Sequence, residues 1–243
     1  MIVLIGTGHV FDLSNALLDI LDERQPDAIA VELDKQRYNA LMMKRAKPES
    51  YKTAEKNVPI IYKLLGRFQN NMAKEYGVNA GDEMVTAINY AQSHQIPLEF
   101  IDMNAQKLFS RMLRTMPFSE KLKLLLSGVG GFFISKKQVE KELGKIHDDF
   151  DIYIEQIGKK FPTIKRVLID ERNTHMVKKL KMLNEEHEKV IACIGDGHVP
   201  GISKLLTEDK IDHEIIRLKE LRDIKSGERA SSTAHFTTEY KSL

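Results

Sequence analysis

Short apolar runs alternate along the chain with longer stretches that have helical periodicity. Five of these runs are predicted to be buried strands: residues 2–6, 28–33, 97–102, 190–195 and 213–218. Each is rich in Ile, Val, Leu or Phe, which is typical of parallel strands covered on both faces. Because helical stretches separate them, the pattern predicts an α/β fold with a central, mainly parallel sheet of about five strands and helices on both faces.

Helix boundaries can be placed between these runs. A helix is expected from Ser14 to about Asp22, and another over 81–94 before the third strand. Asp34 directly follows the second strand and is expected to cap the next helix through its side chain. An apolar stripe over 61–77 predicts a further helix, which we expect to pack into the core.

The remaining segments are predicted to be additions to one domain. We expect a single α/β domain over 1–225, with helical insertions at 50–79 and 104–162. Glycines at 127–133 predict a connection between two helices of the second insertion. The segment 226–243 is polar, lacks periodicity and is predicted to be a frayed tail.

Composition narrows the class of partner. The chain is 42% hydrophobic and 30% charged, as in ordinary soluble globular proteins. A net charge of +2, an aromatic content of 7% and the absence of Trp do not indicate a nucleic-acid partner. No stretch approaches the roughly 18 apolar residues that span a bilayer, and the N-terminus lacks a signal-peptide layout. We therefore expect a cytoplasmic protein without a membrane segment.

A Gly-x-Gly-His pattern follows two of the predicted strands, at residues 6–9 and 195–198. In parallel α/β sheets, ligands bind beyond the carboxyl ends of the strands, where both patterns lie. One copy alone would indicate a histidine that bonds across a turn, whereas two copies favour a shared site formed by His9 and His198. The glycines would let a ligand approach the backbone: Gly6, Gly8, Gly195 and Gly197.

Glu32 closes the second predicted strand at the same edge. Two histidines and one carboxylate would suit a divalent metal, or a general base with an orienting partner. The structural alternative is that Glu32 caps the next helix, although Asp34 already fills that role. Arg37 lies one turn into that helix, near the same edge of the sheet, where a lone arginine is more often a surface residue.

A second arginine lies on the helix predicted over 164–183. Its apolar stripe is formed by Ile164, Leu168, Met176 and Leu183. At the helical step of about 100°, Arg172 projects near the middle of this stripe and Glu171 near its edge. A guanidinium rarely faces a core unless it is paired. Either Glu171 or another carboxylate pairs with Arg172, or Arg172 faces a cleft and binds an anionic group, with Glu171 beside the substrate.

Other nucleophilic mechanisms find little support in the sequence. No Gly-x-Ser-x-Gly nucleophile motif occurs. Cys193, the only cysteine, lies inside an apolar run and is expected to be a small core residue. His175, one turn past Glu171, is a further candidate for the site.

Taken in order, the motifs resemble those of the TraB/PrgY pheromone-shutdown family, within a group that includes the GumN-like proteins and the Tiki proteases. The matching segments are GTGHVFDLS, PDAIAVELDKQRYNAL, NAGDEMVTAINYAQ, PLEFIDMN, LIDERNTHM and IACIGDGHVPGI. Each motif is loose, but their ordered combination is specific and covers nearly the whole chain.

The resemblance implies a fold and a set of site residues. His9 and His198 match the histidines of two Gly-x-x-His motifs, Glu32 the glutamate of the second strand, and Arg37 and Arg172 the family's arginines. The implied fold is similar to the EreA/ChaN type, an α/β core with helical insertions. Tiki members are regarded as metal-dependent proteases, so the resemblance implies that chemistry here.

Two features depart from the family pattern. Many members have an Asp-Arg pair after the third strand, where this chain has Asp102 and Met103. Many also have a C-terminal membrane segment, which we do not expect in this sequence.

The residues and the resemblance together predict a metal-dependent hydrolase that acts on peptides. His9, Glu32 and His198 would hold Mn, Co or Zn or activate its water. Arg37 and Arg172 would stabilise an oxyanion or bind a substrate carboxylate.

Two alternatives remain open from the sequence. The same residues could sequester a peptide or another small ligand without turnover, with the insertion at 104–162 as a lid or a homodimer surface. Haem or tetrapyrrole binding is suggested only by analogy with ChaN-like folds.

Overall fold

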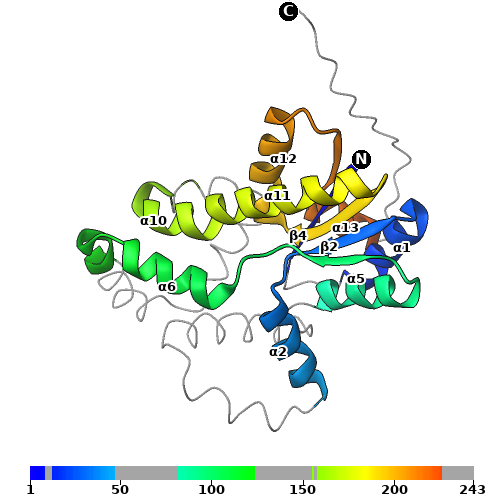
Figure 1. Cartoon of the computed structure of the whole chain (residues 1–243), viewed down its shortest axis with the longest axis horizontal. Coiled ribbons are helices and arrows are strands. Elements are labelled where there is room, and N and C mark those ends of the chain that lie inside the picture. Colours follow the sequence, from blue (N-terminus) through cyan, green and yellow to red (C-terminus); the bar gives the residue numbers. More distant parts are fainter. Residues whose placement is uncertain (9–12, 47–81, 124–154, 156–157, 226–243) are drawn as a thin grey trace, which may run out of the picture.

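The computed structural model describes residues 1–8, 13–46, 82–123, 155 and 158–225 (Figure 1). Several predicted features lie outside these residues: the insertion at 50–79 with its helix over 61–77, the glycine-containing connection at 127–133, and the tail at 226–243. His9 also lies outside the described residues.

A five-stranded parallel sheet forms the centre of the fold (Figure 1). Its strands are β1 (Ile2–Thr7), β2 (Ala28–Val31), β3 (Leu98–Phe100), β4 (Val190–Gly195) and β5 (His213–Ile216). All five predicted strands are therefore confirmed, in the spatial order β3-β2-β4-β1-β5. Three of them end earlier than their apolar runs, and the residues after the ends of β2 and β3 turn towards the site described below.

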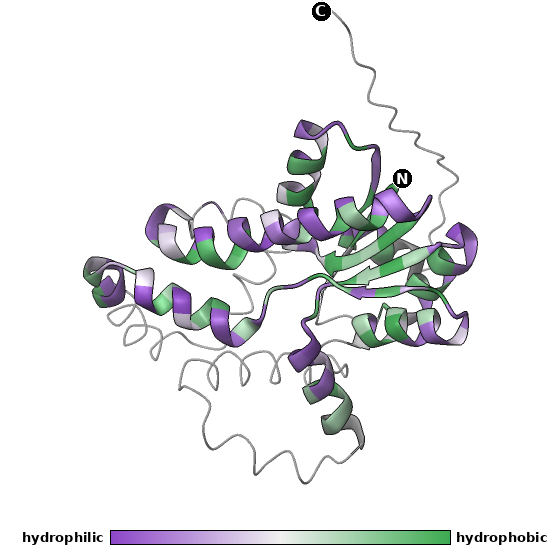
Figure 2. Ribbon diagram, in the orientation of Figure 1, coloured by the Kyte–Doolittle hydropathy of each residue, from purple (hydrophilic) through white to green (hydrophobic). Residues whose placement is uncertain are grey.

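Both faces of the sheet are covered, which explains the apolar strands. On one face, the strands pack against α1 (Ser14–Arg24), α5 (Asp82–Ser93) and α13 (Leu218–Lys225). On the other face lie α11 (Glu171–Glu186) and α12 (Val199–Glu208). Figure 2 shows the hydrophobic strands between these helices, whose outer residues are largely hydrophilic.

The connections that leave the adjacent strands β2 and β4 diverge. The chain passes from β2 by way of α5 to β3 on one side, and from β4 through α12 to β5 on the other. Because these two connections lead in opposite directions, with α5 and α12 on opposite faces of the sheet, the carboxyl ends of β2 and β4 form a topological switch point, where ligands of α/β proteins bind. Thr7 lies opposite Gly195 in the register, so the two Gly-x-Gly-His segments begin side by side.

Two further helices flank this edge of the sheet. Asp34 caps α2 (Lys35–Ala46), as predicted, because its Oδ1 accepts hydrogen bonds from the backbone N–H groups of Gln36 and Arg37 at 2.8 and 3.1 Å. The described parts of the 104–162 insertion are helical: α6 (Ala105–Thr115), residues 118–123 and the start of α10 (Pro162–Lys165).

A single long helix runs through α10, the π-helical turn η2 (Arg166–Asp170) and α11. The wider π turn rotates the residues that follow it relative to an ideal α-helix. Met176 is buried as predicted, but the buried face of α11 is completed by Asn173, Val177 and Leu180. Ile164, before the turn, and Leu168, within it, pack instead against a separate cluster with α6.

Candidate functional site

Arg172, in the first turn of α11, lies at the centre of a polar cluster. Its Nε and Nη2 donate to the two carboxylate oxygens of Asp102 at 2.8 and 2.9 Å. Nη2 also donates to Glu32, while Nη1 donates to His198 Nε2 at 2.8 Å and to the carbonyl oxygen of Leu168 at 3.2 Å. A guanidinium has five N–H groups, so every donor of this side chain has an acceptor.

The partners of Arg172 decide between the alternatives that its position left open. Two carboxylates, Glu32 and Asp102, pair with it, whereas Glu171 does not. Glu171 instead pairs with Arg166 at 2.7 Å and with Arg111 at 3.5 Å, on the side of α6. Burial opposes the charge of Arg172, but the two carboxylates raise its pKa above the ordinary value. Arg172 is therefore a permanent cation.

Glu32 is held by the strand beside it. Its Oε2 accepts a hydrogen bond from the backbone N–H of Gly195 at 2.6 Å. A Cβ on Gly195 would lie 3.2 Å from that same oxygen, so the glycine allows a close approach between the carboxylate and the end of β4. Glu32 is a buried cluster residue, and helix capping is left to Asp34.

Asp102 joins both arginines to the cluster. It follows β3, and its Oδ2 also accepts a hydrogen bond from Arg37 Nη1 at 3.2 Å. The backbone N–H of Met103 donates to Oδ1 at 2.7 Å. Two guanidiniums thus reach Asp102, that of Arg37 from α2 and that of Arg172 from α11.

His198 is a buried, neutral base. Its Nε2 accepts from Arg172, because a guanidinium only donates, and its Nδ1 lies 2.6 Å from Asn173 Oδ1. Nδ1 therefore carries the hydrogen and donates to Asn173. Burial lowers the pKa of His198, against the opposing attraction of Glu32. The imidazole is thus held in one tautomer by an orienting amide on one side and a cation on the other.

A glycine in the neighbouring helix makes room for this orienting amide. Asn173 is buried between α11 and α12, and a Cβ on Gly201 would lie 2.2 Å from Asn173 Nδ2. Atoms at that separation would clash, so a larger residue at Gly201 would displace Asn173. The glycine three positions after His198 therefore has a packing role.

The loop of the second Gly-x-Gly-His segment is fixed by a separate ion pair. Asp196 accepts from Arg217 Nε and Nη2 at 2.9 and 2.7 Å, and from the backbone N–H of Leu218 at 2.9 Å. A Cβ on Gly6 would lie 2.2 Å from Asp196 Oδ1. The glycine of the first segment thus makes room for the aspartate of the second.

The structure brings together four of the predicted site residues. Glu32, Arg172 and His198 are in direct contact, and Arg37 joins them through Asp102. Gly8 and Gly197 belong to the two segments and lie at the same edge of the sheet. Contact with a ligand stays a prediction for five residues: Gly6, Gly8, Gly195, Gly197 and Glu171.

Two residues of the cluster were missed from the sequence. Asp102 follows the third strand just as Glu32 follows the second, so the rule that selected Glu32 would also have selected Asp102. Asn173 begins a buried face that continues with Met176, Val177 and Leu180. A polar residue in register with an apolar stripe was the available signal for Asn173.

The predicted metal site includes His9, which lies outside the described residues. His198 Nε2 and Glu32 Oε1 are 3.5 Å apart, but Arg172 donates to both atoms. Catalytic zinc sites use three protein ligands, and no group of three or more His, Cys, Asp or Glu side chains suited to a metal occurs in the described ranges. The described donors alone therefore do not fit a metal ion, and the set that includes His9 stays a prediction.

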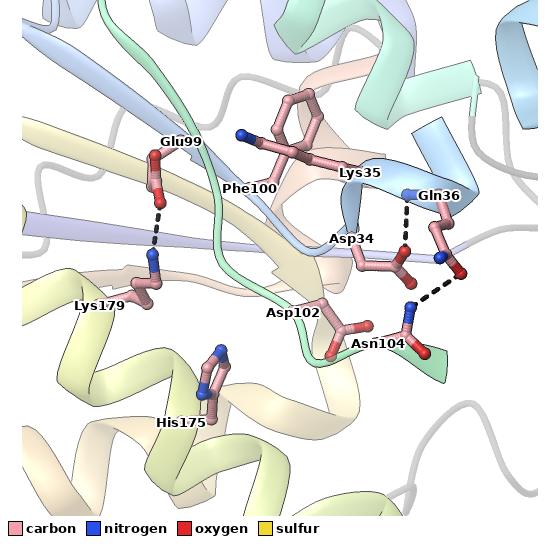
Figure 3. A pocket seen from close by; sticks show the side chains of 9 residues that line it. All are labelled: Asp34, Lys35, Gln36, Glu99, Phe100, Asp102, Asn104, His175 and Lys179. Atoms are coloured by element: carbon pink, nitrogen blue, oxygen red, sulfur yellow. Dashed lines mark hydrogen bonds and ion pairs between the residues drawn. The ribbon is translucent and has the colours of Figure 1, made fainter. Parts of the chain in front are cut away.

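A pocket of about 330 Å³ adjoins the cluster, and Asp102 forms part of its wall (Figure 3). Its other lining residues come from β3, the beginnings of α2 and α6, and α11. The buried cluster thus has a neighbouring space in which a small ligand can lie.

Comparison with known proteins identifies the family of the chain. The model of the TraB/PrgY/gumN family matches residues 1–212. The chain belongs to the TraB/PrgY/gumN family. It is 30% identical to an uncharacterised protein of Methanocaldococcus jannaschii over 94% of this chain and 59% of that protein. It is also 24% identical to the TraB domain-containing proteins of mouse and cattle, over 88% of this chain and 65% of each of those proteins.

These TraB relatives are longer than the present chain, which spans about three fifths to two thirds of their length. Within the described ranges, no helix combines the length and apolarity needed to cross a membrane.

Proposed function

We propose that the cluster of Glu32, Asp102, Arg172 and His198 is the active site of a hydrolase that acts on peptides. The proposal is supported most by the setting of His198, a buried neutral imidazole in contact with a fixed cation and an orienting amide. A general base oriented by a hydrogen-bonding partner is the arrangement expected where a nucleophile must be activated. The position of the cluster at the switch point of the sheet supports the same assignment.

In this proposal, His198 and Arg172 divide the work of hydrolysis. Arg172 turns the Nη1–H that it donates to His198 towards the carbonyl oxygen of the substrate, where negative charge develops as a water molecule attacks. The lone pair of His198 Nε2 then accepts a proton from that water, and His198 returns this proton to the amine nitrogen that leaves as the C–N bond breaks. Asn173 keeps the ring in the required orientation, while Glu32 and Asp102 hold the guanidinium in place.

The peptide substrate is inferred from the resemblance to Tiki proteases, and the predicted divalent metal is part of the same inference. The predicted metal would be held by His9 in addition to Glu32 and His198. The activity assay itself tests whether hydrolysis requires this metal. Activity should be measured in the presence of Mn, Co or Zn and after treatment with a chelator.

A library of internally quenched peptides tests the proposed activity. We expect cleavage by the wild type and at least about a hundredfold slower cleavage by His198→Asn, since general acid–base catalysis contributes 10²–10⁴-fold. His213→Asn is the matched control, because His213 begins β5 at the opposite edge of the sheet. No cleavage by the wild type with any of the metals, or equal cleavage by both variants, would contradict the proposal.

A second candidate is a protein that binds a peptide without cleaving it. The observation that favours it is the complete satisfaction of Arg172, whose five N–H groups already have protein acceptors. The two candidates differ in stoichiometry. A binding protein protects at most an equivalent amount of peptide from an added protease, whereas a hydrolase consumes an excess.

A further inference from the structure

The α6 arm, residues 105–123, comprises α6 and the helical residues 118–123 and extends away from the sheet (Figure 1). The apolar face of α6 packs with Val167 of η2 in a separate small core. Residues 118–123 are held by Glu120, which is buried and accepts from the backbone N–H and the hydroxyl of Thr163 at 3.2 and 3.0 Å. One side of the arm is therefore fixed on the helix of α10 and η2, and the other side is exposed.

The exposed charges of the α6 arm all have the same sign. Glu120 is its one acidic residue, whereas five basic residues are exposed: Lys107, Arg111, Arg114, Lys121 and Lys123. Glu171 neutralises part of this charge, but its carboxylate is shared between Arg111 at 3.5 Å and Arg166 at 2.7 Å. Within the described ranges, the other four basic side chains of the arm form no ion pair. Since the whole chain has a net charge of only +2, the arm is a local concentration of positive charge.

Two large apolar side chains project from the same arm into solvent. Phe118 is 79% exposed, and Leu122, one turn later, is 44% exposed. At the helical step of about 100°, both lie roughly opposite Glu120. Because Glu120 points towards Thr163 in α10, Phe118 and Leu122 point away from α10.

The basic residues of α6 point away from the same helix. Lys107, Arg111 and Arg114 follow one another at positions i, i+4 and i+7, which is one face of a helix. The residues of α6 that pack with η2 lie on the other face. The basic stripe and the apolar pair therefore both face away from the helix of α10 and η2, and one flat surface can meet them together.

The combination of charge and apolar side chains favours a lipid surface over other anionic partners. Peripheral proteins bind anionic bilayers through Lys and Arg at the headgroups, with Phe or Leu inserted at the boundary of the acyl chains. A nucleic acid would use the same charges and could stack on Phe118. The exposed Leu122 beside it, however, is matched by acyl chains and not by bases.

We propose that the α6 arm docks on the surface of an anionic membrane, with Phe118 and Leu122 inserted and the basic residues against the headgroups. Such docking lies in the plane of the interface and requires no spanning helix. The inference is independent of the proposed hydrolysis, since no residue of the arm belongs to the cluster around Arg172.

Sedimentation of the full chain with vesicles tests the docking. The vesicles consist either of phosphatidylcholine alone or of equimolar phosphatidylcholine and phosphatidylserine. We expect binding to the anionic vesicles to be at least about tenfold tighter, because each Lys or Arg near an anionic surface adds to the attraction. This preference should shrink as the salt concentration rises.

Phe118→Gln tests the inserted side chain. Phe118 is mostly exposed, so the fold is retained, and binding to the anionic vesicles should weaken at least about tenfold as apolar burial is lost. Met182→Gln is the matched control, because Met182 is also exposed, at 52%, but lies on α11 outside the arm.

A double charge reversal tests the basic residues. Lys121→Glu combined with Lys123→Glu should weaken binding to the anionic vesicles at least about tenfold. Lys204→Glu combined with Lys219→Glu is the control, because it changes the net charge equally at exposed positions on α12 and α13. Circular dichroism should show the same helical content for all variants.

The docking would be overturned by equal binding to both kinds of vesicle, by no binding to either, or by equal losses in the arm variants and their controls. Binding that depends on the two lysines but not on Phe118 would overturn the insertion of the apolar pair. Binding to single-stranded DNA without binding to vesicles would overturn the membrane assignment and give the arm to a nucleic acid.

Discussion

Alanine at Gly201 should disturb the site from a neighbouring helix. The new Cβ would lie 2.2 Å from Asn173 Nδ2 and 3.2 Å from its Cγ. Ordinary contact begins near 3.5 Å, so the amide would have to move by about 1 Å. Asn173 is 3% exposed and cannot turn outwards freely. Its bond to His198, at 2.6 Å, is therefore the interaction that yields.

The size of the effect follows from three contributions. Overpacking a buried site costs about 1–3 kcal/mol, and loss of the bond between Asn173 and His198 costs about 0.5–1.5 kcal/mol. The higher helix propensity of alanine returns up to about 1 kcal/mol, because Gly201 lies within α12. We expect Gly201→Ala to lower the free energy of unfolding by about 2 kcal/mol.

Denaturant unfolding followed by far-ultraviolet circular dichroism measures this change. The same substitution in an Asn173→Ala background is the control, since that background lacks the amide that clashes. There, Gly201→Ala should be neutral or slightly stabilising, so the double-mutant cycle should give a coupling energy of about 2 kcal/mol. An equal cost of Gly201→Ala in both backgrounds would refute the proposed contact between the helices.

Three further predictions follow from burial and contacts. Arg172→Met should lower the free energy of unfolding by about 3–5 kcal/mol, because it leaves buried carboxylates unpaired. The side chain of Arg37 is 40% exposed, so Arg37→Met should lower it by at most about 1 kcal/mol. Equal losses for the two variants in chemical denaturation would contradict this prediction. Burial raises the pKa of Cys193 to about 12, so a thiol reagent should modify it only after unfolding. Because the unfolded thiol ionises at lower pH, its contribution to stability should fall as the pH rises towards 12, and Cys193→Ala should lack this slope. Gly6→Ala should displace Asp196 and lower the unfolding midpoint, and an unchanged midpoint would argue against their close approach.

Local sequence patterns were sufficient to predict the sheet. The three central strands, β1, β2 and β4, are buried on both faces, so each is a short run of apolar residues. Asp34 was equally predictable, because capping depends only on the residues that follow it. The side-by-side placement of residues 6–8 and 195–197 was inferred from the parallel sheet, and the register of β1 with β4 confirms it.

The partners of Arg172 could not be chosen from local patterns. Spacing indicated that a carboxylate or a cleft was needed, but Asp102 lies 70 positions away and meets Arg172 only because β3 adjoins β2. The π turn η2 lies between Ile164 and Met176, so the stripe predicted with one helical step is divided between two clusters of the core.

Turnover of a peptide by the cluster is the central claim, and counting product molecules per protein chain tests it most directly. An excess of the internally quenched peptides should be incubated with the wild type, His198→Asn and the control His213→Asn, with Mn, Co or Zn and with a chelator. The account predicts many products per chain for the wild type and the control, and a loss of at least about a hundredfold for His198→Asn. At most one peptide altered per chain, or the same rate for all three proteins, would contradict it.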